Sequence, residues 1–199
     1  MRFSALSQLH LRCRYEQFIP GALHPDGRRY LPQVVVTPLD AGPDTAPDTK
    51  LWLVDRHHRV DPELAGRVIS ARLLCALSAV QLQTPPFRAG FTPSPHSAPA
   101  APLSEPIVYG RVAAVLAWEV QREHLPFETL YTELVIALAD EATIGLRTTL
   151  SAPRIADLIG SDLLSAGDWI EVRRSRIDIL ALEPINVAAS PIRMPQTPS

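Results

Sequence analysis

The stretch SAPRIADLIGSDLLSAGDWIEVRRSRIDILAL, residues 151–182, carries the clearest succession of elements in the chain. Ser151 suits a helix N-cap, Pro153 suits the first turn, and apolar residues then recur at helical spacing. We therefore expect a helix over residues 154–164. After the next glycine the residues alternate as two strands, joined by a basic corner at residues 173–175. Helix, strand, strand is the order that this stretch predicts.

Three strands are expected ahead of that stretch. They cover residues 111–120, 130–138 and 143–149. Three strands, a helix and two strands is the succession of an OB-fold, a five-stranded Greek-key barrel.

The first half of the chain follows a similar order. Leu9, Leu11, Cys13 and Tyr15 alternate with His10, Arg12, Arg14 and Glu16, which indicates a half-buried strand with a charged outer face. Further strands are expected at residues 33–37 and Leu51–Val54, and a strand pair at residues 68–82. Residues 56–61, which include adjacent histidines, stand where the second half has its helix.

A proline-rich segment, PPFRAGFTPSPHSAPAAPLSEP, separates the two halves. It has no apolar period, as is typical of a semi-extended linker. We therefore predict an all-β protein of two tandem OB-fold-like five-stranded Greek-key barrels, with at most one short helix each. The predicted domains are residues 1–84 and 107–187, with a linker at 85–106 and a flexible tail at 188–199. Few hydrogen bonds are expected across residues 92–104.

An internal repeat is a further hypothesis. Placing Gly66 on Gly167 sets a register of 101 residues, in which Tyr30 meets Tyr131 and Ile69 meets Ile170. So few identities are close to chance, and the shared order of elements carries the hypothesis.

Charge is distributed unevenly between the halves. Residues 1–88 hold eleven basic and eight acidic side chains, whereas residues 105–187 hold seven arginines against thirteen acidic side chains. The first half is therefore the better candidate for binding a polyanion. Cys13 and Cys75 lie in apolar runs and are interpreted as reduced core residues. The chain begins without the apolar core of an export signal and has no stretch long enough to span a bilayer, so we expect a cytoplasmic protein without membrane contact.

The segment RIADLIGSDLLSAGDWIEVRRSRI, residues 154–177, resembles the corresponding stretch of bacterial single-stranded DNA-binding proteins. There, a short helix leads through a glycine to an alternating strand and a basic hairpin. The resemblance implies an OB-fold that binds single-stranded DNA, or RNA, in replication or repair and that assembles as a homo-oligomer. The chain departs from that family in having two such domains and in ending without an acidic tail.

Cationic grooves and aromatic platforms are the chemistry by which proteins hold single strands. The first barrel offers His10, Arg12, Arg14, Arg28, Arg29, Tyr30, Arg67 and Arg72, and the second offers Trp118, Tyr131, Trp169, Arg173, Arg174 and Arg176. These residues are the predicted nucleic-acid site. The alternative interpretation makes the arginines a solvated surface and the aromatic residues, Trp52 among them, part of the core.

No catalytic motif, cofactor site or metal site is predicted. The chain has no phosphate-binding loop, no nucleophile motif and no cysteine pairs at metal-ligand spacing. His57 and His58 are neighbours without a third ligand, so a surface loop is the favoured interpretation. The second hypothesis for function is a non-catalytic adaptor that uses the barrels for oligomerisation or for binding a protein partner, and an enzyme is a distant third.

Overall fold

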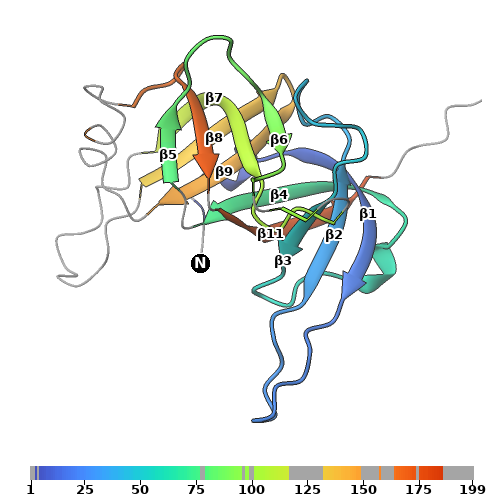
Figure 1. Cartoon of the computed structure of the whole chain (residues 1–199). Helices are drawn as coiled ribbons and strands as arrows, with labels where there is room; N and C mark the ends of the chain where they lie inside the picture. Colours follow the sequence, from blue (N-terminus) through green and yellow to red (C-terminus); the bar gives the residue numbers. More distant parts are fainter. Residues whose placement is uncertain are drawn as a thin grey trace, which may run out of the picture.

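The computed structural model describes residues 3, 5–76, 79–95, 97–98, 101–116, 132–148, 157, 164–173 and 175–185. The described strands form one continuous hydrogen-bonded sheet that curls into two barrels (Figure 1). This confirms the predicted all-β class. Two short 3-10 turns accompany the strands, at Leu6–Gln8 and Pro62–Leu64.

The first barrel is closed and has five strands. They are β1 (Leu11–Ile19), β2 (Gln33–Pro38), β3 (Leu51–Val54), β4 (Val68–Ala76) and β11 (Arg176–Pro184). Their order around the barrel is β1-β2-β3-β11-β4, and pairing of β1 with β4 closes the ring. β11 runs parallel to β3 and antiparallel to β4. The predicted five-stranded barrel is therefore present, but its fifth strand comes from the second half of the chain.

The second barrel repeats this connectivity. Its strands are β7 (Ile107–Leu116), β8 (Thr132–Ala139), β9 (Ala142–Thr148), β10 (Trp169–Arg173) and β5 (Ala79–Leu82), and the short β6 (Gly90–Thr92) pairs with β7. Its outermost strands, β9 and β10, pair with two successive strands of the first half. The end of β4 lies parallel to β9, and β5 lies antiparallel to β10.

Each barrel therefore takes its fifth strand from the other half of the chain. β4 pairs with β11 through Ala76 and Arg176, and β5 pairs with β10 through Val80 and Val172. Both pairings belong to a single antiparallel register, since each pair of residue numbers adds to 252. Two barrels in simple succession are thus not confirmed, and where the chain divides into folding units stays a prediction.

Gly66 and Gly167 occupy equivalent places in the two barrels, which agrees with the 101-residue register. Both have positive φ angles, of 83° and 104°, which favour glycine. The Gly66 amide donates to the Tyr15 carbonyl at 2.7 Å, and the Gly167 amide donates to the Val112 carbonyl at 2.8 Å. In both barrels the same strand residue donates back to the residue after the glycine. The repeat is therefore visible in backbone geometry, where few side chains are identical.

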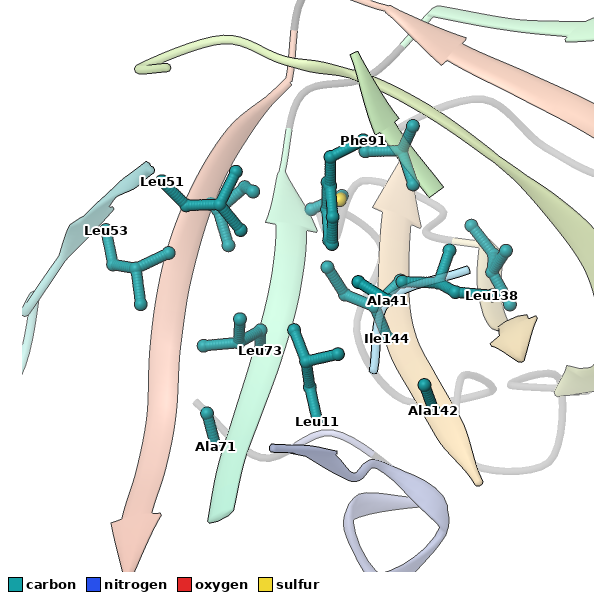
Figure 2. Close-up of a cluster of buried hydrophobic side chains, with 14 of the residues drawn as sticks. Leu11, Ala41, Leu51, Leu53, Ala71, Leu73, Phe91, Leu138, Ala142 and Ile144 are labelled. Carbon is teal, nitrogen blue, oxygen red and sulfur yellow. The ribbon is translucent and has the colours of Figure 1, made fainter. Parts of the chain in front are cut away.

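One hydrophobic core runs through both barrels. Leu51 and Leu53 of the first barrel, Leu73 of the strand between the barrels, and Ile144 of the second belong to the same buried cluster (Figure 2). The alternation at the start of the chain is confirmed, because Leu11, Cys13 and Tyr15 are fully buried. A smaller cluster packs the residues before β1 against β4 and β8, and it comprises Phe3, Ala5, Leu9, Leu74 and Val135.

The proline-rich segment does more than space the barrels. Phe91 in β6 is fully buried, and the Leu103 amide donates to the Lys50 carbonyl at 2.7 Å. The Trp52 amide then donates to the Leu103 carbonyl at 2.9 Å. Backbone hydrogen bonds therefore hold the segment to the barrels, because Phe91 and Leu103 are buried and the prolines exclude only some donors.

The predicted helix over residues 154–164 lies outside the described residues, except for Asp157, which is helical, and Leu164. The predicted strand pair at 68–82 is confirmed as β4 and β5. Within the described part of the chain, no helix is both long and apolar enough to cross a membrane.

Candidate nucleic-acid interface

A β-hairpin arm projects from the first barrel between β1 and β2 (Figure 1). We call residues 20–31 the tongue. Its two arms are joined by the His24 amide, which donates to the Arg28 carbonyl at 2.7 Å, and by the Tyr30 amide, which donates to Ala22 at 2.9 Å. Gly21 allows this approach, because a Cβ at that position would overlap the Tyr30 carbonyl. The tongue is therefore a hairpin whose two arms are held together by backbone hydrogen bonds.

Exposed aromatic and cationic side chains cover the tongue. Tyr30 is 59% exposed, and its ring meets that of His24 edge-on at 5.6 Å between centroids. Arg28 and Arg29 are both exposed and form no ion pair with a carboxylate of the described residues. The one acidic residue of the tongue, Asp26, contacts His24 at 2.9 Å and accepts the Arg28 amide at 3.0 Å. Arg29 Nη1 also donates to the Gly21 carbonyl at 3.3 Å. The tongue thus combines an exposed aromatic ring with two exposed guanidinium groups that no described carboxylate neutralises.

The outer face of β1 carries two of the predicted arginines. Arg12 forms an ion pair with Asp40 at 2.9 Å, and each side chain is 49% exposed. Arg14 is exposed, and its register partner on β4 is Val68, the residue after the exposed Arg67. The backbones of Arg14 and Arg67 are therefore adjacent at this end of the barrel, and both side chains are exposed.

The other predicted residues of the first barrel are engaged in contacts within the protein. His10 shares a hydrogen bond with Ser70 at 2.9 Å, and its backbone bridges to Thr143 of the second barrel. Arg72 forms an ion pair with Glu183 at 3.2 Å. The Arg72 side chain and the His10 backbone thus join the two halves of the chain, while the His10 side chain is held within the first barrel.

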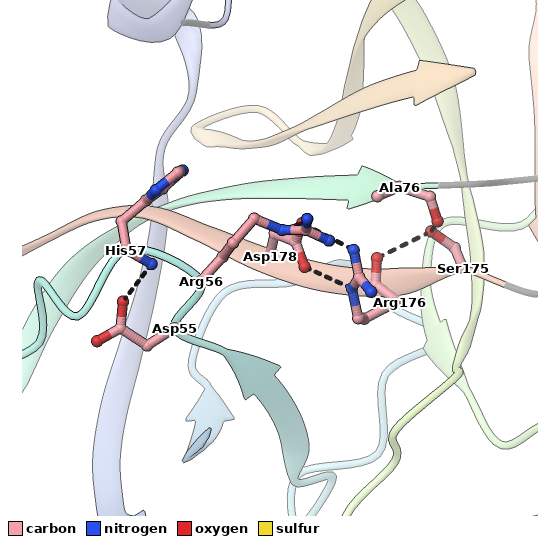
Figure 3. Close-up of polar contacts among 7 residues, drawn as sticks. All are labelled: Asp55, Arg56, His57, Ala76, Ser175, Arg176 and Asp178. Atoms are coloured by element: carbon pink, nitrogen blue, oxygen red, sulfur yellow. Dashed lines mark hydrogen bonds and ion pairs between the residues drawn. The ribbon is translucent and has the colours of Figure 1, made fainter. Parts of the chain in front are cut away.

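An arginine cluster lies where β3 meets β11 (Figure 3). Asp178 accepts from Arg56 Nε at 3.2 Å and from Arg176 Nε at 2.6 Å, and its side chain is only 10% exposed. Two guanidinium groups therefore flank one nearly buried carboxylate, and the cluster carries a formal charge of +1. We keep the name arginine cluster for Arg56, Arg176 and Asp178.

The loop that supplies Arg56 is organised by the buried carboxylate of Asp55. This side chain accepts the backbone amides of His57 at 3.3 Å, Arg59 at 3.0 Å and Val60 at 3.0 Å. His58 adopts a positive φ of 51° within the turn. The prediction that the histidine pair belongs to a surface loop is confirmed, and Asp55 fixes the direction in which the loop presents its cations.

A cavity of about 310 Å³ adjoins the arginine cluster. It is lined by Gln33, Trp52, Val54, Ala76, Ser104, Glu105 and Arg176. The indole Nε1 of Trp52 is buried and has no hydrogen-bond partner among the described residues. A second cavity, of about 400 Å³, lies between the loop at residues 44–50 and the segment at residues 91–103.

The predicted residues of the second barrel are occupied within the protein where they are described. The ring of Trp169 stacks on Phe87, with centroids 5.3 Å apart and an interplanar angle of 4°. Arg173 forms an ion pair with Glu171, which raises the pKa of the guanidinium. Trp118, Tyr131 and Arg174 lie outside the described residues.

The two barrels differ in how many of their described arginines form ion pairs. Among the described residues, the arginines without a carboxylate partner are Arg14, Arg28, Arg29, Arg59, Arg67 and Arg111. Only Arg111 belongs to the second barrel. The cationic groups that remain free to meet an external anion are therefore concentrated on the first barrel and its loops.

Both cysteines are buried, and the possible metal ligands of the described residues do not cluster. Burial raises the pKa of the Cys75 thiol to about 12 and that of Cys13 further still, so neither side chain is a ready thiolate. Within the described residues no group of three or more histidine, cysteine or acidic side chains converges as metal ligands.

Sequence reasoning missed the residues around the cavity. Gln33 and Ser104 have no distinctive neighbours in the sequence, and Arg56 was considered only with the histidine pair. Trp52 was weighed as a core residue or a stacking platform. The missing information is the pairing of β3 with β11, because it joins positions more than 120 residues apart.

Comparisons with known proteins give little further guidance. No family model matches the chain, and no curated protein matches it. A solved structure of the cytoplasmic molybdate-binding protein ModG with molybdate bound is similar, with 17% sequence identity and a TM-score of 0.43, over 93% of this chain and 100% of that chain. A likeness of this size decides neither the fold nor the ligand of this chain.

Proposed function

We propose that this protein binds single-stranded nucleic acid through the tongue and the adjoining surface of the first barrel. The observation that carries the proposal is the concentration of exposed arginines without carboxylate partners on this barrel, beside an exposed tyrosine ring. Single strands are held by cations that follow the phosphates and by aromatic rings on which bases stack. The tongue offers both within a few residues.

Each group has a distinct part in this proposal. Arg28 and Arg29 contact phosphates and release the counterions condensed on the strand. Tyr30 supplies a stacking face for one base, and the backbone pairing of the tongue keeps that ring in place at a small entropic cost. Arg14 and Arg67 form a second pair of phosphate contacts along the barrel. The predicted residues Arg12, Arg72, Arg173 and Arg176 contribute less, since each already faces a carboxylate.

A salt series tests the proposal. Binding of the full chain to a fluorescein-labelled oligo-dT is followed by anisotropy at several salt concentrations. Replacing Arg28 and Arg29 together with Ala should reduce the slope of log K against log salt by about 1.4, since each phosphate contact contributes about 0.7. Tyr30→Ala should weaken binding about 5- to 150-fold and leave the slope unchanged, because stacking contributes about 1 to 3 kcal/mol per base.

Arg111→Ala is the matched control. It removes an exposed, unpaired arginine from the second barrel and should leave both affinity and slope close to those of the parent protein. Equal effects of Arg111→Ala and of an arginine substitution in the tongue would mean that binding follows overall charge alone. The same titration with oligo-rU compares RNA with DNA.

A protein-binding adaptor is the second candidate. It is favoured by Leu23 and Leu31, which are 63% and 38% exposed on the tongue. Exposed apolar side chains on a projecting arm suit a protein partner or a second copy of the chain. Absence of oligonucleotide binding at low salt, with the protein folded, would favour this function over the first, and sedimentation would then show whether the chain self-associates.

A further inference from the structure

We infer that the cavity beside Trp52 receives a single nucleobase from the bound strand. This inference rests on the proposed function and deepens it, because it assigns a base-reading site next to the phosphate contacts. The cavity is formed by residues of β2, β3, β4 and β11 and by residues 104 and 105, near the end of the proline-rich segment.

The position of the cavity connects it to the tongue. The second arm of the tongue carries Arg28, Arg29 and Tyr30 and leads through Pro32 directly to Gln33, which lines the cavity. On the other side lies the arginine cluster, which contributes Arg176 to the cavity wall. A strand whose phosphates lie along the tongue therefore reaches the cavity without crossing the barrel.

The lining suits a flat ligand with both donors and acceptors. Trp52 provides an aromatic side chain, and Val54 and Ala76 provide apolar contacts. The Gln33 amide both donates and accepts, and the Ser104 hydroxyl does the same. Glu105 adds an acceptor that suits an exocyclic amino group and disfavours phosphate. Base edges present such mixed patterns when a single strand is splayed open.

Arg176 is held in place as a donor. Its Nε and Nη2 atoms donate to Asp178 at 2.6 and 3.2 Å, which uses two of the five N–H groups of a guanidinium. Arg56 contacts the same carboxylate from the other side, at 3.2 Å. Asp178 thus fixes the plane of the Arg176 guanidinium and leaves further N–H groups available for a ligand carbonyl.

The size of the cavity fits a single base as well. The cavity volume of about 310 Å³ is at the lower end of the range for small-molecule sites, about 300 to 1,000 Å³, as a single base requires.

The experiment uses the full chain and short oligo-dT strands in which one thymine is replaced by 2-aminopurine. The substituted position is moved along the strand, and 2-aminopurine emission is recorded on binding. We expect a strong change in emission at one position or two adjacent positions. Gln33→Ala should abolish that change and weaken binding about tenfold, with the salt slope unchanged. Trp52→Phe keeps an aromatic ring in the cavity wall and should weaken binding less.

Arg111→Ala is again the control and should preserve the position-specific emission change. If the oligonucleotides bind but Gln33→Ala and Trp52→Phe leave affinity and emission unchanged, the inference about the cavity is overturned and the proposed function stands. If no oligonucleotide binds at low salt, the proposed function fails. The probe is then free 2-aminopurine riboside. Binding that depends on Gln33 supports a base site, and absence of binding overturns it.

Discussion

The two barrels share their strand connectivity but differ in how their second and third strands are joined. In the first barrel residues 39–50 connect β2 to β3, whereas in the second barrel only residues 140 and 141 separate β8 from β9. The long connection is bound to the proline-rich segment. Asp44 accepts the Ala89 amide at 2.7 Å, and Thr45 accepts the Phe91 amide at 2.9 Å. Asp44 and Thr45 therefore tie the long connection to the proline-rich segment.

The barrels also differ in how many arginine and aromatic side chains lack a partner within the described part of the protein. The described arginines of the second barrel, apart from Arg111, face carboxylates, and the indole ring of Trp169 is stacked on Phe87. The first barrel keeps exposed arginines and an open tyrosine ring on a projecting arm. The repeated architecture thus exposes cationic and aromatic side chains on the first barrel, whereas those described in the second barrel are mostly engaged in contacts within the protein.

The largest effect is expected from separating the halves. Residues 1–84 contain β1 to β5 but lack β11, and residues 107–185 lack the segment that pairs with β9 and β10. Neither half can close its barrel, so each should be unfolded or aggregated when expressed alone. Circular dichroism and amide NMR spectra of the two fragments test this.

Mixing fragments that together span the chain provides the control. Residues 1–106 and 107–199 between them keep β6 and the buried Phe91, and they should recover the spectrum of the full chain, because the exchanged strands then meet in trans. Two separately folded fragments, as expected for tandem domains joined by a linker, would contradict this prediction. So would a linker cut by protease that leaves two stable pieces.

Sequence reasoning recovered what depends on local pattern. The alternation around Arg12 predicted β1 and its buried face, and the apolar run at residues 68–82 predicted β4 and β5. It could not recover the exchange of fifth strands. A strand that completes its own barrel and a strand that completes the other have the same alternation, and the choice depends on pairing between residues about 100 positions apart.

For the candidate site, the structure shows which of the predicted residues are exposed and which are engaged in ion pairs. Arg28, Arg29 and Tyr30 were predicted as site residues, and the structure places all three on the exposed tongue. The ion pairs of Arg12 with Asp40 and Arg72 with Glu183 could not be read from the sequence, since the partners lie on different strands. Charge alone therefore overstated how many arginines are free.

The next effect concerns how far the two barrels unfold together. Ile177 in the first barrel and Ile170 in the second are both fully buried, and both belong to the shared core. Replacing either with Ala should lower the free energy of unfolding by about 2 to 5 kcal/mol. Because the core is continuous, each variant should still show one thermal transition by calorimetry. Val115→Ala is the exposed control. Two separate transitions, each sensitive to only one substitution, would show that the barrels unfold independently.

A smaller effect is expected where the long connection holds the proline-rich segment. Asp44→Ala would leave the Ala89 amide and the Arg88 guanidinium without their acceptor. A buried donor left unpaired costs about 1 to 3 kcal/mol, and denaturant titration should show a loss within that range. Asp48→Ala removes an exposed carboxylate from the same connection and should have little effect. If the two variants prove equally stable, Asp44 does not stabilise the contact between the long connection and the proline-rich segment.

The smallest effect distinguishes Tyr15 from its equivalent in the second barrel, Val112. The Tyr15 hydroxyl is buried without a hydrogen-bond partner among the described residues, so Tyr15→Phe should raise the free energy of unfolding by about 1 kcal/mol at neutral pH. Burial, followed by the charges of Asp61 and Asp55, raises the pKa of Tyr15 to about 12. The folded protein therefore favours the neutral phenol, and this contribution to stability is complete below about pH 10 and is lost as pH rises through 12.

Denaturant titrations at pH 8 and pH 11 measure how much free energy of unfolding is lost at the higher pH. This alkaline loss should be smaller for Tyr15→Phe than for the parent protein, whereas Tyr30→Phe, at the exposed ring of the tongue, should retain the full loss. An alkaline loss that is the same in all three proteins would mean that the Tyr15 phenol ionises as readily in the folded barrel as in the unfolded chain.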